Sequence, residues 1–295
     1  MRSSRIRCVY FLIGILLMYS TFEISGQPSD STRTPGNIKR AVKQSAVIYT
    51  AGMATLSLAW YDLERQPFTW FNDASEWKQM DKAGHFSTTF FLSRVTTLHL
   101  KNSRMNPSKA ALTGSLISIF ALSSIEILDG FSPAYGASVS DIGANVLGGL
   151  FYLIQQNQGN DPIVYPKFSF YPSGLASQRP SMLGKNFTEQ ILKDYNGQTY
   201  WMSVDMDRVS RFPRWLNLAV GYGASDMIYA RDQQNLEAGF MPYRKWMLGI
   251  DIDLSDIPTK HKALKNLFSV VKIIRIPAPA IEFSRDKLSL HPFFF

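Results

Sequence analysis

Cysteine is almost absent from this sequence. The 295 residues include a single one, Cys8, inside an apolar stretch near the N-terminus. If that stretch is removed on export, the remaining chain can form no disulfide and has no thiol nucleophile and no cysteine metal ligand. Cys8 also lies at the start of the apolar run, so it does not occupy the place of the lipidated cysteine of a bacterial lipoprotein.

Charged residues are also scarce. They make up 18% of the chain, against roughly 25% in soluble domains, whereas aromatic residues reach 13%. Basic residues outnumber acidic ones by 31 to 23, which gives a formal net charge of +8. No zinc-finger or RNA-binding signature accompanies this surplus. A basic surface that faces anionic lipid headgroups is therefore favoured over a nucleic-acid partner.

Motifs of nucleophilic and nucleotide chemistry are missing as well. The sequence has no G-x-S-x-G elbow, no P-loop and no dinucleotide-binding fingerprint. Ser93-Arg94 and His99 resemble part of a lipid-phosphatase motif, but the spacing differs and the partner motifs are absent. These absences count against covalent catalysis.

The N-terminus has the layout of a secretory signal peptide. Three arginines precede the apolar run at residues 8–22, and Gly26 offers a small residue for cleavage. Residues 1–26 are therefore predicted to be a signal peptide, with an uncleaved anchor helix as the alternative. The run is short for a full membrane span. Residues 27–37 are rich in Ser, Thr, Pro and Gly and predict a flexible lead-in.

Four helices are predicted within residues 38–158. Pro107, with Asn106 before it, opens the third helix, and Ser138 or Ser140 caps the fourth. The apolar cores are about 16–18 residues long, just short of a comfortable span. A packed bundle lying at a membrane surface and helices that dip into the bilayer both remain open. The predicted helices cover residues 37–64, 81–100, 107–128 and 138–156.

The second half, residues 159–295, has a different pattern. Alternating apolar residues at 216–222 and 246–254 predict two short strands. Residues 187–195 predict a short helix, and 262–276 predict an amphipathic helix or a long strand, while 160–185 look irregular. The expected fold is mainly α, a bundle of about four helices followed by a smaller, irregular α+β C-terminal region.

A group of polar residues on the last three predicted helices forms the candidate site. Asp81 and His85 are four residues apart and share a helix face. Glu126 is the one charge in the apolar body of its helix. Antiparallel up-down packing would bring the start of the second helix, the end of the third and the start of the fourth to one end of the bundle. The predicted polar pocket contains Asp81, Lys82, His85, Glu126 and Asp141 as catalytic candidates, with Ser140 and Asn145 as binding residues.

This pocket has a functional and a structural interpretation. A histidine with carboxylates can act as a general acid and base or bind a divalent metal. Acids such as Asp81 and Asp141 are, however, also favoured in first turns by the helix dipole, and Ser138 with Asp141 resembles a capping box. The histidine and the acids could then be buried pairs that fix helix register. The sequence identifies no cofactor and no particular metal.

The order and spacing of these residues carry a family resemblance over about residues 70–155. Asp81-Lys82-x-x-His85-Phe86, Glu126, and Ser140-Asp141-x-x-x-Asn145-x-x-Gly148 resemble the YfiM-like family of predicted periplasmic lipoproteins, a domain of unknown function. The same order is distantly similar to the VanZ-like membrane proteins. The resemblance implies a helical domain in the bacterial cell envelope and no defined activity.

Two functions are therefore expected. The first is a membrane-associated envelope protein, on the periplasmic side and associated with the outer membrane, that binds lipid or a cell-wall component in the polar pocket. The alternative is a metal-assisted or general acid/base hydrolase or transferase acting on envelope lipid or glycan. In that case His85 is the base, Asp141 or Glu126 orients it or binds metal, and Lys82 stabilises developing negative charge.

Overall fold

The computed structural model describes residues 38–60, 66–133, 136–156, 161–256, 259–261, 264, 268 and 271–295. The predicted signal peptide, Cys8 and the lead-in lie outside these residues, as does much of 262–276. The chain divides into two compact units. The helical unit contains Met1–Asp73 and Thr88–Asp161, and the sheet unit contains Ala74–Ser87 and Pro162–Phe295. Helix α3 (Met80–Asn102) runs without interruption through the chain boundary at Ser87.

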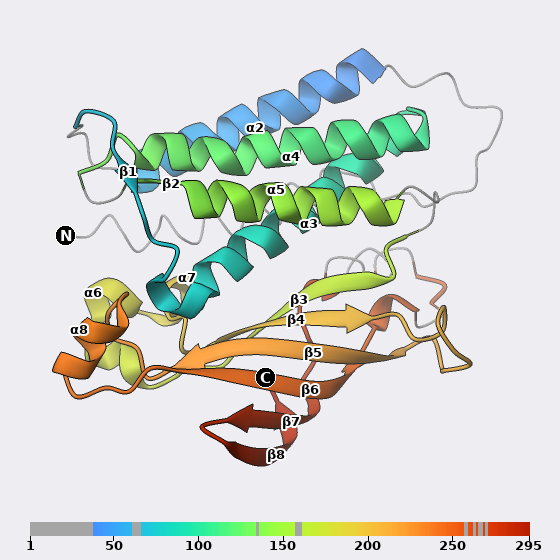
Figure 1. Ribbon diagram of the computed structural model, residues 1–295. Helices are drawn as coiled ribbons and strands as arrows, with labels where there is room; N and C mark the ends of the chain where they lie inside the picture. Colours follow the sequence, from blue (N-terminus) through green and yellow to red (C-terminus); the bar gives the residue numbers. More distant parts are fainter. Residues whose placement is uncertain are drawn as a thin grey trace. The chain divides into compact units, whose positions relative to one another are not determined.

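The helical unit contains all four predicted helices (Figure 1). They are α2 (Ile38–Trp60), the larger part of α3, α4 (Pro107–Asp129) and α5 (Val139–Gln156). The start of α4 is set by its cap, since the Asn106 side chain accepts from the N–H groups of Ser108 and Lys109. A short parallel pair, β1 (Trp70–Phe71) and β2 (Ala137–Ser138), precedes α5.

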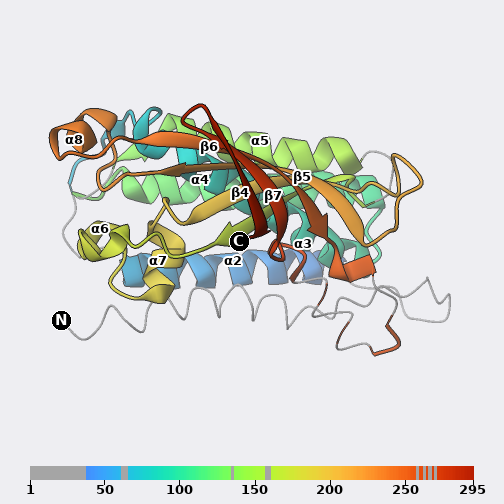
Figure 2. The same ribbon diagram turned by 90° about the horizontal axis from the view of Figure 1, so that it is seen from below.

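Helix α4 packs through small side chains. Its buried residues, apart from Glu126, are Ala110, Ala111, Gly114, Ser115, Ser118 and Ala121. A Cβ on Gly114 would lie 2.5 Å from Thr97 Oγ1 and 2.9 Å from the Thr97 backbone nitrogen, so the close approach of α3 requires glycine there. Helix α5 lies beside α4 in both ribbon views (Figures 1 and 2). It too buries small or polar residues, with Tyr152 as the one large apolar exception.

Many of the large apolar side chains of these two helices are exposed, and most of the others are half-buried. The exposed residues are Leu112, Leu116, Phe120 and Ile127 on α4, and Val139, Leu147, Leu150 and Ile154 on α5. Among the described residues, α4 is the one helix that is long and apolar enough to cross a membrane, and only a third of its most apolar stretch is buried. The two helices thus have small or polar interiors and apolar exteriors.

The sheet unit is built on six antiparallel strands that follow one another in chain order. They are β3 (Val164–Phe170), β4 (Gln198–Val204), β5 (Leu216–Ser225), β6 (Tyr243–Ile252), β7 (Ala278–Ser284) and β8 (Lys287–Phe294). Short helices α6 (Pro180–Leu183), α7 (Phe187–Lys193) and α8 (Asp232–Glu237) join them, together with the 3-10 turns η2 (Leu175–Ser177) and η3 (Leu254–Asp256). The 3-10 turn η1 (Glu76–Gln79) comes directly before α3. Pro166 and Pro292 lie on the two edge strands, where a missing N–H disrupts no inner ladder.

The prediction of a mainly α fold is wrong. The six-stranded sheet makes the chain α+β, and the C-terminal half is an ordered sheet unit and not a smaller irregular region. The two predicted strands are present as β5 and β6, and the predicted helix at 187–195 is α7. The stretch predicted to be irregular contains β3. Strands β3 and β4 were not predicted because their buried side carries polar residues such as Lys167, Ser169, Thr199 and Ser203. Strand β7 buries only Ala278 and Ala280, and β8 buries no residue, so neither has a strongly apolar buried side.

The two faces of the sheet differ in an unusual way. One face buries charged and polar groups around Trp201. There Lys167 Nζ lies 2.6 Å from Asp251 Oδ2, Ser203 donates to the same carboxylate, and the Arg275 guanidinium stacks on the Trp201 ring. The opposite face carries apolar side chains from β5 to β8, many of them exposed. Buried pairs of this kind satisfy one another, so the polar face serves as the core of the unit.

Candidate functional site

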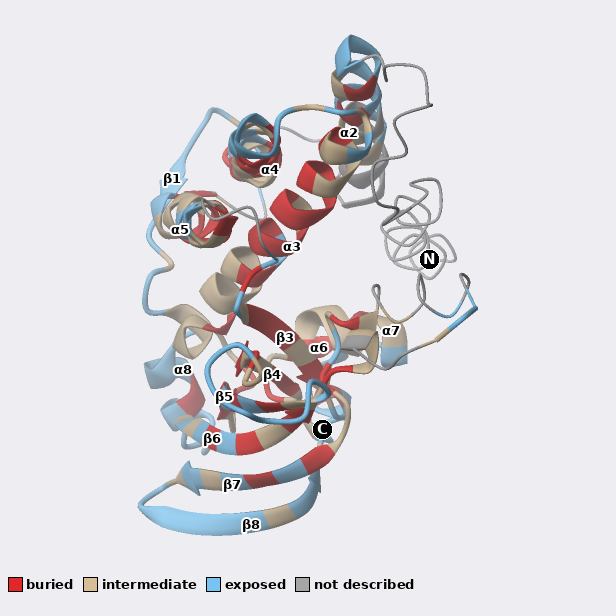
Figure 3. Cartoon of the chain, turned by 90° about the vertical axis from the view of Figure 1, so that its right-hand side faces the viewer, coloured by how far each residue is buried: buried red, intermediate tan, exposed pale blue. Residues whose placement is uncertain are grey.

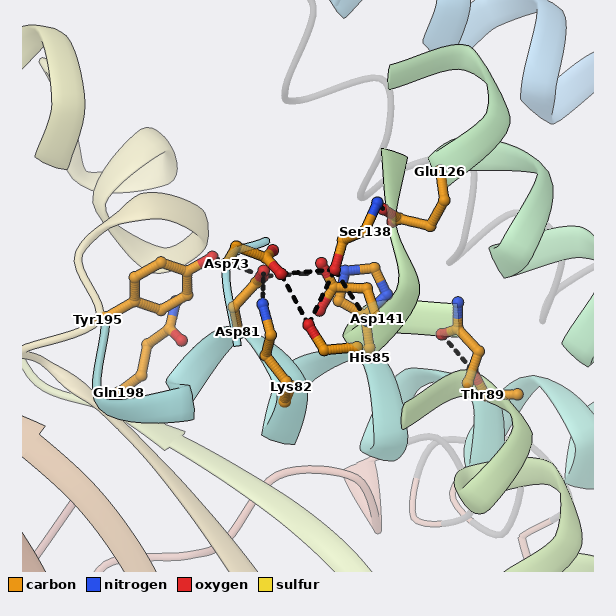
Figure 4. A network of polar contacts seen from close by, with 12 residues as sticks. Asp73, Asp81, Lys82, His85, Thr89, Glu126, Ser138, Asp141, Tyr195 and Gln198 are labelled. Atoms are coloured by element: carbon orange, nitrogen blue, oxygen red, sulfur yellow. Dashed lines mark hydrogen bonds and ion pairs between the residues drawn. The ribbon is translucent and has the colours of Figure 1, made fainter. Parts of the chain in front are cut away.

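The first turns of α3 hold one group of candidate residues, all within the sheet unit. Asp81 Oδ1 accepts a hydrogen bond from the Tyr195 hydroxyl at 2.8 Å. Lys82 Nζ lies 3.4 Å from Asp81 Oδ2, and His85 Nε2 lies 3.8 Å from Asp81 Oδ1, one helical turn away. Figure 4 shows Asp81 with Lys82 and Tyr195. The carboxylate is therefore shared by a phenol, an ammonium group and an imidazole, and the four-residue spacing of Asp81 and His85 predicts the last of these.

A strained turn positions this group. The three residues before α3, namely Trp77, Lys78 and Gln79, have φ values of 48°, 51° and 64°, which bulky side chains rarely adopt. Neighbouring segments of the sheet unit hold the turn in place. The Trp77 N–H donates to the Ala230 carbonyl at 2.7 Å, and Arg244 Nη2 donates to Gln79 Oε1 at 2.6 Å. Such strain persists only where the surroundings over-determine it.

Tyr200 of β4 lies close to the same turns of α3. A Cβ on Gly84 would lie 2.9 Å from the Tyr200 hydroxyl oxygen, so glycine lets α3 approach this ring. Burial, and then the charge of the Asp81 carboxylate, raise the pKa of Tyr200 well above its ordinary value. The phenol is therefore neutral at physiological pH and donates to Gln198 Oε1 at 3.0 Å.

The second group lies in the helical unit, where α4 ends and α5 begins. Glu126 is 3% exposed, and its Oε2 accepts from the Ser138 N–H at 3.2 Å. Ser138 Oγ in turn accepts from the Asp141 N–H at 3.0 Å, so the predicted serine cap of α5 is confirmed. Asp141 itself is 3% exposed. One turn later, Asn145 Oδ1 accepts from the Thr89 hydroxyl at 3.0 Å.

Asp73 belongs to this second group and was missed as a site residue. Its position in the sequence, three residues before the 3-10 turn at Glu76–Gln79, fits only a capping role. Instead its Oδ1 accepts from the hydroxyls of Ser138 at 2.6 Å and Ser140 at 2.7 Å (Figure 4). The parallel pairing of β1 with β2 aligns Phe71 with Ser138 and so brings Asp73 to the start of α5. Two-residue strands leave no periodic signal in a sequence, so nothing in it could have identified Asp73.

The structure thus arranges the predicted residues in two groups. Asp81, Lys82 and His85 lie together on α3. Glu126, Ser140 and Asp141 lie together with Asp73 and Ser138, and Asn145 continues along α5. Each group combines carboxylates with donors that hold them, which suits recognition of a polar ligand or a cation. The joining of the two groups into one pocket stays a prediction.

Fold and side chains define an α+β protein with an apolar-surfaced helical unit, a sheet unit with a polar core, and acidic groups at helix starts. Residues 68–156 match the family described as "Predicted periplasmic lipoprotein (DUF2279)". The expected relation to predicted periplasmic lipoproteins is confirmed for this segment, which contains both groups of site residues. The similarity to VanZ-like proteins is not shown. No curated protein matches the chain, and no solved structure matches it.

Proposed function

We infer that this chain is a periplasmic cell-envelope protein that associates with a membrane through the apolar outer surfaces of α4 and α5. The observation that carries this inference is the polarity of the two helices, which bury mostly small and polar residues and expose large apolar ones. Helices in contact with lipid pack through small residues because lipid covers their large ones. In water, each exposed leucine would forgo roughly 1.5–3 kcal/mol of burial free energy.

Membrane extraction tests this association. The mature protein is expected to stay with the membrane pellet in high-salt buffer and to be released by detergent. Leu112→Ser with Leu116→Ser, both at exposed positions of α4, should move part of it to the soluble fraction. Leu236→Ser, at an exposed apolar position of α8, is the matched control. Complete release of the unaltered protein by salt alone would refute the proposal.

The same protein is proposed to bind a lipid headgroup or cell-wall component through polar residues that include Asp81, His85 and Asp141. In the sheet unit, His85 lies one turn after Asp81 on α3, with 3.8 Å between the imidazole and the carboxylate. In the helical unit, Asp141 is buried at the start of α5, one turn before Asn145, which pairs with Thr89. The strained turn before α3 also supports a functional role, since strain of this kind clusters at binding and active sites.

Stability measurements distinguish this site from a structural lock. If His85 and Asp141 bind a ligand, His85→Ala and Asp141→Asn should unfold close to the temperature of the unaltered protein. They should nevertheless fail to rescue the envelope defects of a deletion strain. If the pair only fixes helix register, each variant should lose a few kcal/mol of stability, as broken buried pairs do. His261→Ala, at an exposed histidine, is the control.

A second candidate function is metal-assisted hydrolysis or group transfer. The Asp81–His85 pair favours it, because a carboxylate and an imidazole are common ligands of zinc and similar ions. Metal analysis of the purified protein tests it. Stoichiometric metal that is lost in His85→Ala and retained in His261→Ala supports the enzyme, whereas a metal-free protein with normal rescue favours the binding function.

A further inference from the structure

A second apolar surface lies on the sheet unit, separate from α4 and α5. Strand register aligns two rows of side chains on one face of the sheet. The first row is Met202, Val220, Leu248, Ile281 and Leu290, and the second is Tyr200, Tyr222, Trp246, Phe283 and Leu288. The part of these rows on β5 to β8 is called the β5–β8 apolar face below.

Most of the β5–β8 apolar face is exposed. The exposed fractions are 51% for Val220, 55% for Leu248 and 73% for both Leu288 and Leu290. Figure 3 shows β8 exposed along almost its whole length. The core of the sheet unit lies on the opposite face, where Lys167 pairs with Asp251. A contiguous apolar face of this extent on a soluble protein marks an interaction surface.

The loop that leads into β5 indicates what covers this face. Val209, Phe212 and Trp215 are exposed there and alternate with arginines. The loop has three arginines, Arg208, Arg211 and Arg214, against two aspartates, Asp205 and Asp207. Aromatic residues and arginines side by side suit the headgroup layer of a membrane, and the surplus positive charge is complementary to anionic lipid.

We propose that the β5–β8 apolar face lies on the surface of a phospholipid bilayer, with residues 206–215 in the layer of anionic headgroups. Apolar side chains of β5 to β8 then contact acyl chains, while the polar face keeps its ion pairs away from lipid. A second copy of the chain is the competing occupant. It would cover the apolar residues equally well but would not use the surplus positive charge of the loop, where Arg208 and Arg214 pair with Asp205 and Asp207.

A local probe tests the proposal in the full chain. With Cys8→Ser as background, single cysteines at Val220, Leu248 and Leu290 are labelled with an environment-sensitive fluorophore and mixed with vesicles of zwitterionic lipid with or without anionic lipid. The three labels are expected to shift to the blue and gain intensity. A label at Gln234, exposed on α8, should not respond. Unchanged emission at all three positions overturns the proposal, even if the protein binds vesicles through α4.

Matched charge substitutions provide the second arm. Leu248→Lys and Leu236→Lys replace leucines of similar exposure, 55% and 57%, on and off the face. Leu248→Lys should weaken vesicle binding roughly tenfold or more, since a buried leucine contributes about that factor, and Leu236→Lys should not. Arg214→Gln should weaken binding to anionic vesicles only. A dimer that Leu248→Lys dissociates, with vesicle binding unchanged, would assign the face to a second copy and overturn the proposal.

Discussion

At the scale of single residues, the polar face of the sheet depends on buried ion pairs. Asp253 Oδ2 lies 2.9 Å from Lys272 Nζ, and both side chains are buried. Burial by itself raises the pKa of Asp253, but the charges of Lys272 and Lys167 outweigh it and lower the pKa below its ordinary 3.8. The folded state therefore favours the ionised carboxylate.

The sign of this shift gives a pH prediction. The lowered pKa contributes stability above pH 3.8, and this contribution is lost as the pH falls through the folded-state pKa. The Asp253→Asn substitution should lower the free energy of unfolding by about 3–5 kcal/mol at neutral pH, because Lys272 is left buried without its carboxylate. Urea unfolding at several pH values measures both effects.

The difference in free energy of unfolding between the unaltered protein and Asp253→Asn should become smaller at low pH, because Asp253 itself becomes protonated there. A difference that stays constant across the acid range would contradict the role of this pair. Ser255→Ala removes a hydroxyl that donates to Asp253 Oδ1 but leaves the ion pair, so it should show a smaller loss.

Residue patterns predicted part of the candidate site. The four-residue spacing of Asp81 and His85 and the serine three residues before Asp141 both specify local helix geometry, and both are present. Asp73 and Tyr195 could not be predicted. They reach their partners through strand pairing and through a contact 114 residues away in sequence, and neither leaves a local pattern.

At the scale of elements, the effect of replacing a helix glycine depends on whether that glycine contacts a neighbouring helix. Gly114→Ala should destabilise the helical unit by about 1–3 kcal/mol, because its Cβ would collide with Thr97, including the backbone nitrogen. On α5, a methyl group added at Gly143 would have nothing within 4 Å. Gly143→Ala should therefore stabilise by up to about 1 kcal/mol through helix propensity.

Thermal unfolding in detergent measures both variants under one condition. Equal effects of the two alanines would mean that α3 and α4 do not approach as closely as the structure shows. The pair is well matched because both glycines lie inside helices and both changes add a single methyl group.

Helices and strands could be predicted where the sequence contains capping residues or a clear apolar–polar alternation. Asn106 and Pro107 specify the start of α4, and alternation specifies β5 and β6. Strand β3 was not predictable, because its buried side carries Lys167 and Ser169 while Phe168 and Phe170 are less buried. Alternation of apolar and polar residues indicates a strand most clearly when the apolar residues are the buried ones. In β3 the polar residues are buried and the phenylalanines are more exposed.

At the scale of the whole molecule, two apolar surfaces on two units make a combined prediction. If α4 and the β5–β8 apolar face each contact lipid, the Leu112→Ser, Leu116→Ser pair and Leu248→Lys should each weaken vesicle binding, and the triple variant should weaken it more than either alone. Vesicle flotation measures the bound fraction. An effect of the triple variant no larger than that of Leu248→Lys would exclude α4 from lipid contact.

Membrane identity follows as a separate prediction. Density-gradient separation of envelope fractions is expected to place the protein with the outer membrane. Recovery with the inner membrane would contradict the outer-membrane location but would leave the lipid-binding proposals in place. Leu248→Lys should lower recovery in whichever membrane fraction contains the unaltered protein, while Leu236→Lys should not.

The chain order of the sheet has a consequence for how the protein matures. Every strand from β4 to β8 pairs with the strand that precedes it along the chain. Contacts between sequence neighbours form faster than distant ones, because less loop entropy is lost in making them. A polypeptide that emerges from an export channel with its N-terminus first can therefore add each strand as it arrives. The last strand, β8, then completes the sheet and places Phe294 against Trp201, while the Phe294 carbonyl accepts from Arg275 on the ion-paired side.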